Sequence, residues 1–214
     1  IRIHDEIKAF GLESNVLELE LFGYTVIEPD KVASPDFIER MRNAVLDVAR
    51  RKSGVEIDAE HGFQSRSKID AMGTFDESGA TDNLGWFIGH RVLFEDPVFE
   101  EAVMNPVALA ISSYLMGYHF VLNSTLIWLK QGPTPDEVMQ NWEGGMHSDS
   151  WLPEPFPPFV QQVNCTWALS DYSRDNGGLL FVPGSHKLQR RPDHTLQEGR
   201  EQLVPVECPA GSLI

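Results

Sequence analysis

The clearest periodic pattern of apolar residues lies between residues 34 and 52. Four apolar residues recur there at helical spacing: Phe37, Met41, Val45 and Val48. Ser34 precedes the run as a helix N-cap residue, and Pro35 stands at the first helical position, where a missing amide hydrogen costs little. The pattern therefore predicts an amphipathic helix over residues 34–52 whose apolar face belongs to the core.

Helical and loop signals also flank this segment. A second helical region is predicted over residues 96–117, interrupted at Asn105-Pro106 and ended by Gly117. Residues 23–28 read as a short strand ahead of the first helix. The tract between residues 53 and 85 is polar and rich in glycine, and a loop of that length in a compact domain is usually functional or mobile.

From His119 onward the apolar pattern changes to short runs typical of strands. Turn residues separate five such runs, which cover residues 119–130, 159–171, 177–185, 201–208 and 211–214. Helices followed by several short strands predict a mainly β fold, with helices packed against a sandwich or barrel. We find no repeat or domain boundary, so residues 1–214 are expected to form a single domain, with a helical part to about residue 118 and a β core from about residue 119.

Composition and charge limit the classes of partner that the chain is expected to bind. The chain has 214 residues, of which 42% are hydrophobic and 23% charged, which is typical of a globular protein with a sizeable core. A net charge of −15 argues against nucleic acid, and no apolar run approaches the roughly 18 residues of a membrane span. Two cysteines, Cys165 and Cys208, are too few for a disulfide framework and fit a reducing, cytoplasmic compartment. A small-molecule substrate is the expected partner, and the oligomeric state is not indicated.

Both ends of the sequence are expected to be interior points of a longer protein. The chain begins at Ile1 rather than methionine, and no signal-peptide pattern follows. It ends at Ile214 within an apolar run that has no closing turn.

His147 and Asp149 are the candidate catalytic and metal-ligating residues. In an extended segment, residues two apart face the same way, so the imidazole and the carboxylate point into one space while Ser148 turns away. Such a pair supplies two ligands of the 2-His-1-carboxylate triad that holds iron(II). In a chain with seven histidines, a His-x-Asp in a surface turn also arises readily by chance.

The residues after this pair favour the metal interpretation. A loop rich in proline and aromatic residues follows, then a strand, then "ALSDYSRDNGGLLFVPGSHK" at residues 168–187. Their order and spacing resemble the phytanoyl-CoA dioxygenase family of iron(II)/2-oxoglutarate-dependent oxygenases, in which His-x-Asp precedes "AL-D" and "NG-L--VPGSH". The resemblance covers residues 119–214 well and the preceding helices more loosely. It implies a double-stranded β-helix, a jelly-roll fold like that of cupins, with the metal at the barrel mouth.

The resemblance also implies the cofactors and the remaining ligands. These are Fe(II), 2-oxoglutarate as cosubstrate and O2, with ascorbate as a supporting reductant. The family's second histidine ligand and its 2-oxoglutarate-binding arginine follow a stretch that begins here with residues 210–214, so both are expected beyond Ile214. An apolar strand ending there would otherwise leave a barrel edge unpaired. His186 in the "PGSH" turn is interpreted as fastening that turn rather than as a replacement ligand.

Further residues are assigned to the cosubstrate by the same resemblance. Leu126 and Thr166 are expected to flank 2-oxoglutarate, and Arg91 is the basic residue that some members recruit for it. Thr166 suits strand packing equally well, and Arg91 equally suits a surface charge.

The substrate is expected to meet Trp151, Phe156 and Asn164. The two aromatic residues form an apolar wall or simply cover the barrel mouth, and Asn164 shares a face with Thr166 in a regular strand. The loop over residues 53–85 is a candidate lid that excludes water. Three basic residues either meet an anionic substrate or form a solvated face: Lys187, Arg190 and Arg191.

The function that this pattern indicates is hydroxylation of an unactivated C–H bond in a small organic molecule. Asp149 favours hydroxylation over halogenation, because related halogenases replace that carboxylate with a small residue. Two alternatives remain open: a cupin-like metalloenzyme that does not use 2-oxoglutarate, and a non-catalytic jelly-roll binding protein.

Overall fold

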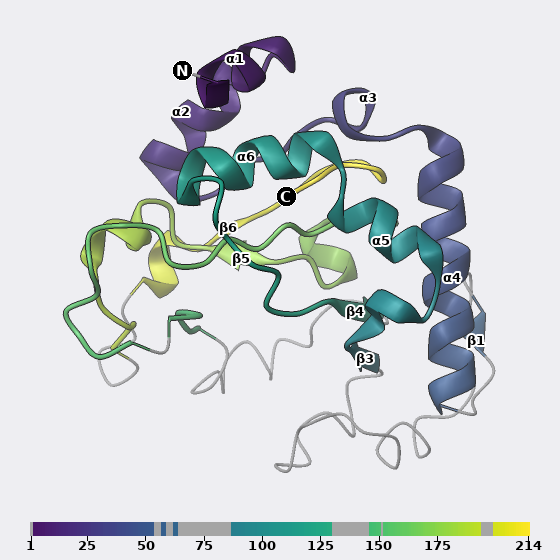
Figure 1. Cartoon of the computed structure of the whole chain (residues 1–214). Helices are drawn as coiled ribbons and strands as arrows, with labels where there is room; N and C mark the ends of the chain where they lie inside the picture. The colour runs from purple at the N-terminus through teal and green to yellow at the C-terminus, as the bar shows by residue number, and fades with distance from the viewer. Residues whose placement is uncertain are drawn as a thin grey trace.

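The computed structural model describes residues 2–53, 57–58, 62–63, 87–129, 146–150, 152–193 and 199–214. The helices are α1 (Arg2–Ala9), α2 (Glu13–Phe22), α3 (Pro29–Val32), α4 (Pro35–Ser53), α5 (Pro97–Val103) and α6 (Pro106–Met116). The strands are β1 (Ile57–Asp58), β2 (Gly62–Phe63), β3 (Phe87–His90), β4 (Leu126–Leu129), β5 (Leu180–Phe181) and β6 (Val204–Pro205). In Figure 1, α5 and α6 lie above β3 to β6, and α4 stands between these strands and β1.

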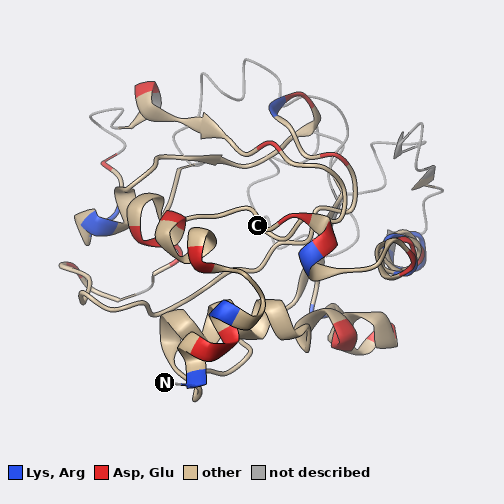
Figure 2. Cartoon of the chain, turned by 90° about the horizontal axis from the view of Figure 1, so that it is seen from above, with Lys and Arg blue, Asp and Glu red and all other residues tan. Residues whose placement is uncertain are grey.

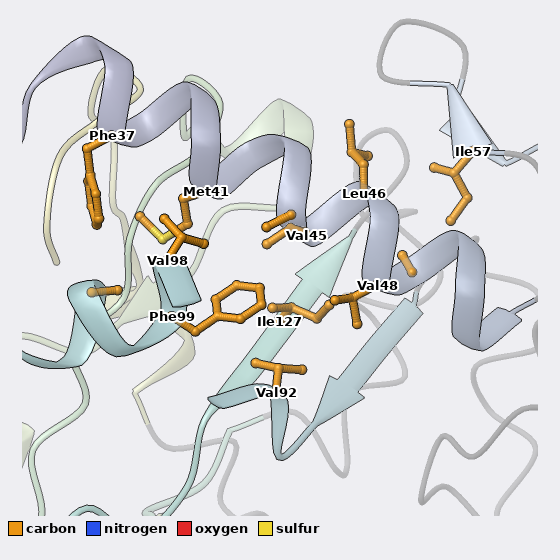
Figure 3. Close-up of a cluster of buried hydrophobic side chains, with 13 residues drawn as sticks. Phe37, Met41, Val45, Leu46, Val48, Ile57, Val92, Val98, Phe99 and Ile127 are labelled. Atoms are coloured by element: carbon orange, nitrogen blue, oxygen red, sulfur yellow. The ribbon is translucent and has the colours of Figure 1, made fainter. Parts of the chain in front are cut away.

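Helix α4 confirms the predicted amphipathic helix. The hydroxyl of Ser34 accepts a hydrogen bond from the amide of Phe37 at 3.2 Å, as expected of an N-cap residue. All four predicted core residues are buried. Figure 3 shows their side chains directed from α4 toward α5 and β4, where they meet Val98, Phe99 and Ile127. The apolar stripe is therefore core, because it is the surface on which α5 and the β3–β4 pair rest.

The break between α5 and α6 also lies where the sequence places it. The side-chain oxygen of Asn105 accepts from the amides of Val107 and Ala108, at 3.0 and 3.2 Å. Its amide group donates to the carbonyl of Val32 at 2.7 Å, which ties the start of α6 to α3. Gly117 ends α6 with φ of 77°, a conformation that favours glycine.

Helices α1 to α3 were not predicted as separate elements. The apolar residues of α2 are spread around the helix, with Leu17 and Leu21 exposed while Leu19 packs against the core, so they form no single stripe. Helix α3 is only four residues long and begins at Pro29. Both depend on tertiary packing, and periodicity detects only a helix that has one buried face.

The strands are shorter than the apolar runs suggest. Of the run at 119–130, only β4 is a strand in the described part, paired antiparallel with β3 so that Leu126 lies opposite His90. Val121, within that run, is 85% exposed. Helical residues outnumber strand residues in the described ranges, so the mainly β class is not seen there, and a complete double-stranded β-helix is not shown. An alternating pattern marks two faces, but a strand also needs a partner along its length.

The C-terminal segment is paired on both sides. The backbones of Leu213 and Ile27 exchange hydrogen bonds of 2.8 and 3.0 Å, which confirms extended structure within residues 23–28. On the other side, Trp167 bridges to Leu213, and Thr166 and Ile214 exchange hydrogen bonds of 2.8 and 2.9 Å. Leu213 is therefore not an unpaired edge residue. Figure 1 shows this segment passing beneath α6.

Two clusters of buried apolar side chains support this arrangement. One joins α4, α5 and β4, and the other joins α1, α3, α6 and Leu213. Trp167 and Ala33 pack against both clusters. The segment that contains Thr166 and Trp167 is therefore fixed between the two clusters, shortly after the residues of the candidate site.

The described part of the chain carries many acidic side chains and no membrane-spanning helix. Figure 2 shows acidic residues on helices and loops around the molecule, in keeping with the net charge of −15. Among the described helices, none is long and apolar enough to cross a membrane.

Candidate active site

His147 and Asp149 lie in direct contact. Residues 146–150 have no regular strand, yet Nε2 of His147 lies 3.2 Å from Oδ1 of Asp149. The histidine side chain is 69% exposed and the aspartate side chain 44% exposed. The predicted convergence of the imidazole and the carboxylate is present in the structure, and both groups remain open to solvent.

Asn164 reaches the same carboxylate from a segment fifteen residues later in the chain. Its Nδ2 donates to Oδ2 of Asp149 at 2.6 Å. Nε2 of Gln162 in turn donates to the side-chain oxygen of Asn164 at 3.3 Å. Because Asn164 takes Oδ2 while His147 faces Oδ1, the rotation of the carboxylate is determined by its two partners.

The electrostatics of the pair favour an ionised carboxylate. The hydrogen bond from His147, followed by the one from Asn164, holds the pKa of Asp149 below its ordinary value, against the opposing effect of partial burial. A charged carboxylate and an imidazole nitrogen are both good donors to a divalent metal ion.

The spacing of the pair fits a metal ion. Two ligand atoms at right angles, each about 2.1 Å from a metal, are about 3 Å apart. The 3.2 Å between His147 Nε2 and Asp149 Oδ1 is close to that value. A bound ion would replace the direct hydrogen bond between them. Within the residues that the structure describes, no group of three or more His, Cys, Asp or Glu side chains gathers as a metal site.

Of the three residues predicted to bind the cosubstrate, Leu126 lies on β4 and Arg91 beside it, whereas Thr166 lies in a separate segment. Arg91 directly follows β3, and its backbone amide donates to Thr125 at 2.8 Å, which places it beside Leu126. Leu126 is 47% exposed and faces away from the core that holds Ile127. Thr166 is half-buried and is hydrogen-bonded through its backbone to Ile214. Arg91 and Leu126 are thus brought together by strand pairing.

The predicted substrate residues differ in their surroundings. Asn164 contacts the candidate ligand Asp149 itself. Phe156 is half-buried, and the guanidinium carbon of Arg191 lies 5.1 Å from its ring centroid. Most of the candidate lid, residues 54–56, 59–61 and 64–85, lies outside the described residues, as do Trp151 and His194.

His186 fastens the turn that contains it, as the sequence indicates. The amide of Gly184 donates to the carbonyl of Phe22 at 2.8 Å. A Cβ atom added to Gly23 would lie only 2.5 Å from Nδ1 of His186, so the ring rests directly on the glycine that ends α2. This contact joins the "PGSH" turn to α2.

Two residues near the site were missed or misjudged from the sequence. Gln162 alternates with Asn164 along the segment, and this spacing of two was an available signal for a shared face. Arg191 is exposed, as one reading of the charge pattern expected, but it also binds the loop after Asp149, which the pattern did not indicate. Charge alone gives no signal for such a contact.

Comparison with known families bears on this geometry. The model of the family Phytanoyl-CoA dioxygenase (PhyH) matches residues 19–214. The chain belongs to this family. Phytanoyl-CoA dioxygenase family proteins have a cupin-like fold and are generally dependent on iron(II) and 2-oxoglutarate. The match includes His147, Asp149 and Asn164.

Individual relatives are more distant. Uncharacterized proteins of Mycobacterium bovis and Mycobacterium tuberculosis are each 30% identical over 118 residues, 55% of this chain and 42% of the relative. A protein of Aspergillus fumigatus named as a dioxygenase is 27% identical over 120 residues, 56% of this chain and 36% of the relative. The matched part thus covers less than half of each relative. No solved structure matches significantly.

Proposed function

We propose that this chain carries the metal-binding residues of an iron(II)- and 2-oxoglutarate-dependent dioxygenase that hydroxylates an unactivated C–H bond of a small organic molecule. The observation that carries the proposal is the convergence of His147 Nε2 and Asp149 Oδ1, 3.2 Å apart, within a chain that belongs to a family of dioxygenases. Their spacing fits two adjacent ligands of one ion.

The protein residues have distinct roles in this proposal. His147 and Asp149 hold the ion, and Asn164 keeps the carboxylate turned so that Oδ1 is the ligand atom. Leu126, Thr166 and Arg91 are proposed to border 2-oxoglutarate. Bound iron and 2-oxoglutarate supply the chemistry by which O2 oxidises the keto acid to succinate and CO2 and a substrate C–H group to an alcohol.

The substrate is proposed to approach past the loop that follows Asp149. This loop carries Trp151 and Phe156, whose aromatic rings are suited to an apolar substrate wall. Asp149 also supports hydroxylation rather than halogenation, because its carboxylate occupies a ligand position that a halide would need.

The test is conversion of 2-oxoglutarate to succinate by the purified full-length protein with iron(II), O2 and ascorbate, across a broad substrate panel. The wild type is expected to form succinate, and His147→Ala and Asp149→Ala are expected to reduce formation to background. His119→Ala and Asp175→Ala, which change exposed residues of the same types, are matched controls that should retain it.

The alternatives give other outcomes. Tight metal binding through His147 and Asp149 without 2-oxoglutarate turnover would indicate a cupin-like metalloenzyme of another class. A protein that binds neither metal nor 2-oxoglutarate would be a jelly-roll binding protein, and the dioxygenase proposal would be refuted.

A further inference from the structure

Arg191 binds two backbone carbonyls in the segment that directly follows the ligand pair. Its Nη2 donates to the carbonyl oxygen of Ser150 at 2.9 Å and to that of Leu152 at 3.1 Å. Arg191 lies about forty residues further along the chain than these two residues. A single guanidinium nitrogen therefore fixes the spacing of two carbonyls, one of which belongs to the residue after Asp149.

The same arginine holds the following loop, residues 152–158, which we name the proline loop. Its backbone amide donates to Oε1 of Glu154 at 2.7 Å, and Nη1 lies 3.5 Å from the same oxygen. Its guanidinium lies 5.1 Å from the ring centroid of Phe156. The amide of Phe156 donates to the carbonyl of Gln189 at 2.7 Å, so the segment around Arg191 holds the loop through both backbone and side chain.

These contacts suit arginine in particular. Its guanidinium is planar and permanently charged, and it can donate to carbonyls while one face stacks on an aromatic ring. The ion pair with Glu154 is about half-exposed and is weak by itself, as surface pairs generally are. The specificity lies in the combination, since a lysine ammonium at this position cannot both reach two carbonyls and stack flat on Phe156.

Ser150 connects this cluster to the candidate metal site. Its carbonyl is held by Arg191, and its hydroxyl donates to Oε1 of Gln161 at 3.0 Å. Gln161 lies three residues before Asn164, which binds Asp149. The residue after Asp149 is therefore held on one side by Arg191 and on the other by the segment that also orients the carboxylate.

We infer that Arg191 is a positioning residue: it clamps Ser150 and the proline loop and thereby sets the placement of Asp149 and of the wall that the substrate meets. The inference rests on the proposed function only where it names a metal ion and a substrate. The contacts with Ser150, Leu152, Glu154 and Phe156 do not depend on it.

The test uses full-length Arg191→Ala and Arg191→Lys, with Arg174→Ala, at an exposed arginine, as the matched control. Hydrogen exchange at the Phe156 amide reports the clamp, and the Kd for Mn(II), measured well below the thermal midpoint, reports the ligand pair. In Arg191→Ala, exchange should quicken about tenfold, as expected for loss of charge-assisted hydrogen bonds, and the Kd should rise severalfold. Arg191→Lys should restore the exchange rate and the Kd only in part. Arg174→Ala should change neither the exchange rate nor the Kd by more than about twofold.

An unchanged exchange rate at Phe156 in Arg191→Ala would overturn the clamp. Faster exchange with an unchanged Mn(II) affinity would also overturn the inference, because the arginine would then hold the loop without acting on the pair. Should Arg191→Ala fail to fold, Arg191→Lys and Glu154→Gln carry the same measurements. A wild-type protein that does not bind Mn(II) would refute the proposed function, whereas the exchange result would still decide whether Arg191 clamps the loop.

Discussion

Replacing Asn164 with alanine removes one of the two groups that orient the candidate ligand Asp149. The bond lost is the 2.6 Å hydrogen bond from Nδ2 of Asn164 to Oδ2 of the carboxylate. Hydrogen bonds to charged groups contribute about 1.5–3 kcal/mol. Because the Asp149 side chain is 44% exposed, water can replace part of that hydrogen bond. We therefore take its contribution to be near the lower limit of this range.

A loss of about 1.4 kcal/mol corresponds to a tenfold weaker affinity for metal. Removing a residue that orients a metal ligand typically lowers metal affinity by between about 10-fold and 100-fold. This range and the hydrogen-bond energy therefore agree on a loss of about tenfold. The measurement is calorimetric titration of the full-length protein with Mn(II) under anaerobic conditions. Asn164→Ala should raise the Kd about tenfold, and it should also bring the pKa of Asp149 closer to its ordinary value, because one of the two bonds that lower it is lost.

Gln162→Ala is the matched control. It removes only the 3.3 Å bond to the side-chain oxygen of Asn164 and leaves the contact with Asp149 in place. We expect less than about a threefold change in Kd, because this neutral bond is long and exposed. Equal affinities of wild type and Asn164→Ala would refute the reasoning, as would an equal loss in both variants.

Three further predictions concern the scaffold. Asn105→Ala should lower the free energy of unfolding, measured in urea, by about 2 kcal/mol, because it removes both a helix cap and the hydrogen bond to Val32. Asp96 caps α5 through one amide, so Asp96→Ala should lower it by about 1 kcal/mol. Equal losses in the two variants would contradict this prediction. In the same assay, Gly23→Ala should lower the free energy of unfolding more than Gly11→Ala does. Both glycines have positive φ, but only at Gly23 would the added methyl group meet a side chain, that of His186. The reverse order would be inconsistent with that contact. Burial, followed by the charge of Lys187, holds the pKa of His186 below its ordinary value, so the unfolded state binds more protons and stability should fall as pH falls through that range. His186→Gln should reduce this slope in urea midpoints measured between about pH 5 and 7, and an identical slope would exclude His186 as its source.

The parts of the fold that could be predicted are those stabilised by local interactions. Helix α4 and the break at Asn105 follow from side-chain spacing and capping, because a helix pairs its backbone with residues four positions away. Strand lengths were overestimated for the opposite reason. Whether the run at 119–130 forms a strand depends on a partner elsewhere in the chain. Among its described residues, 119–129, strand pairing is limited to residues 126–129, which pair with β3.

The candidate ligands could be predicted for a similar reason. His147 and Asp149 are two residues apart, so an extended backbone alone directs their side chains to one place. The family motif at residues 168–187 then supported a metal site. What surrounds the pair could not be predicted, because Asn164 and Arg191 are brought in from distant positions.

By itself, the sequence determined helix α4, the helical region that contains α5 and α6, the convergence of His147 and Asp149, and the family. The tertiary structure alone decided that Asn164 binds Asp149, that Leu213 pairs with both Ile27 and Trp167, and that the exposed Arg191 binds the proline loop. The physical reason is that sequence patterns report interactions between near neighbours. Contacts between distant residues depend on the packing of several elements at once, and no local pattern records which polar group will meet which partner.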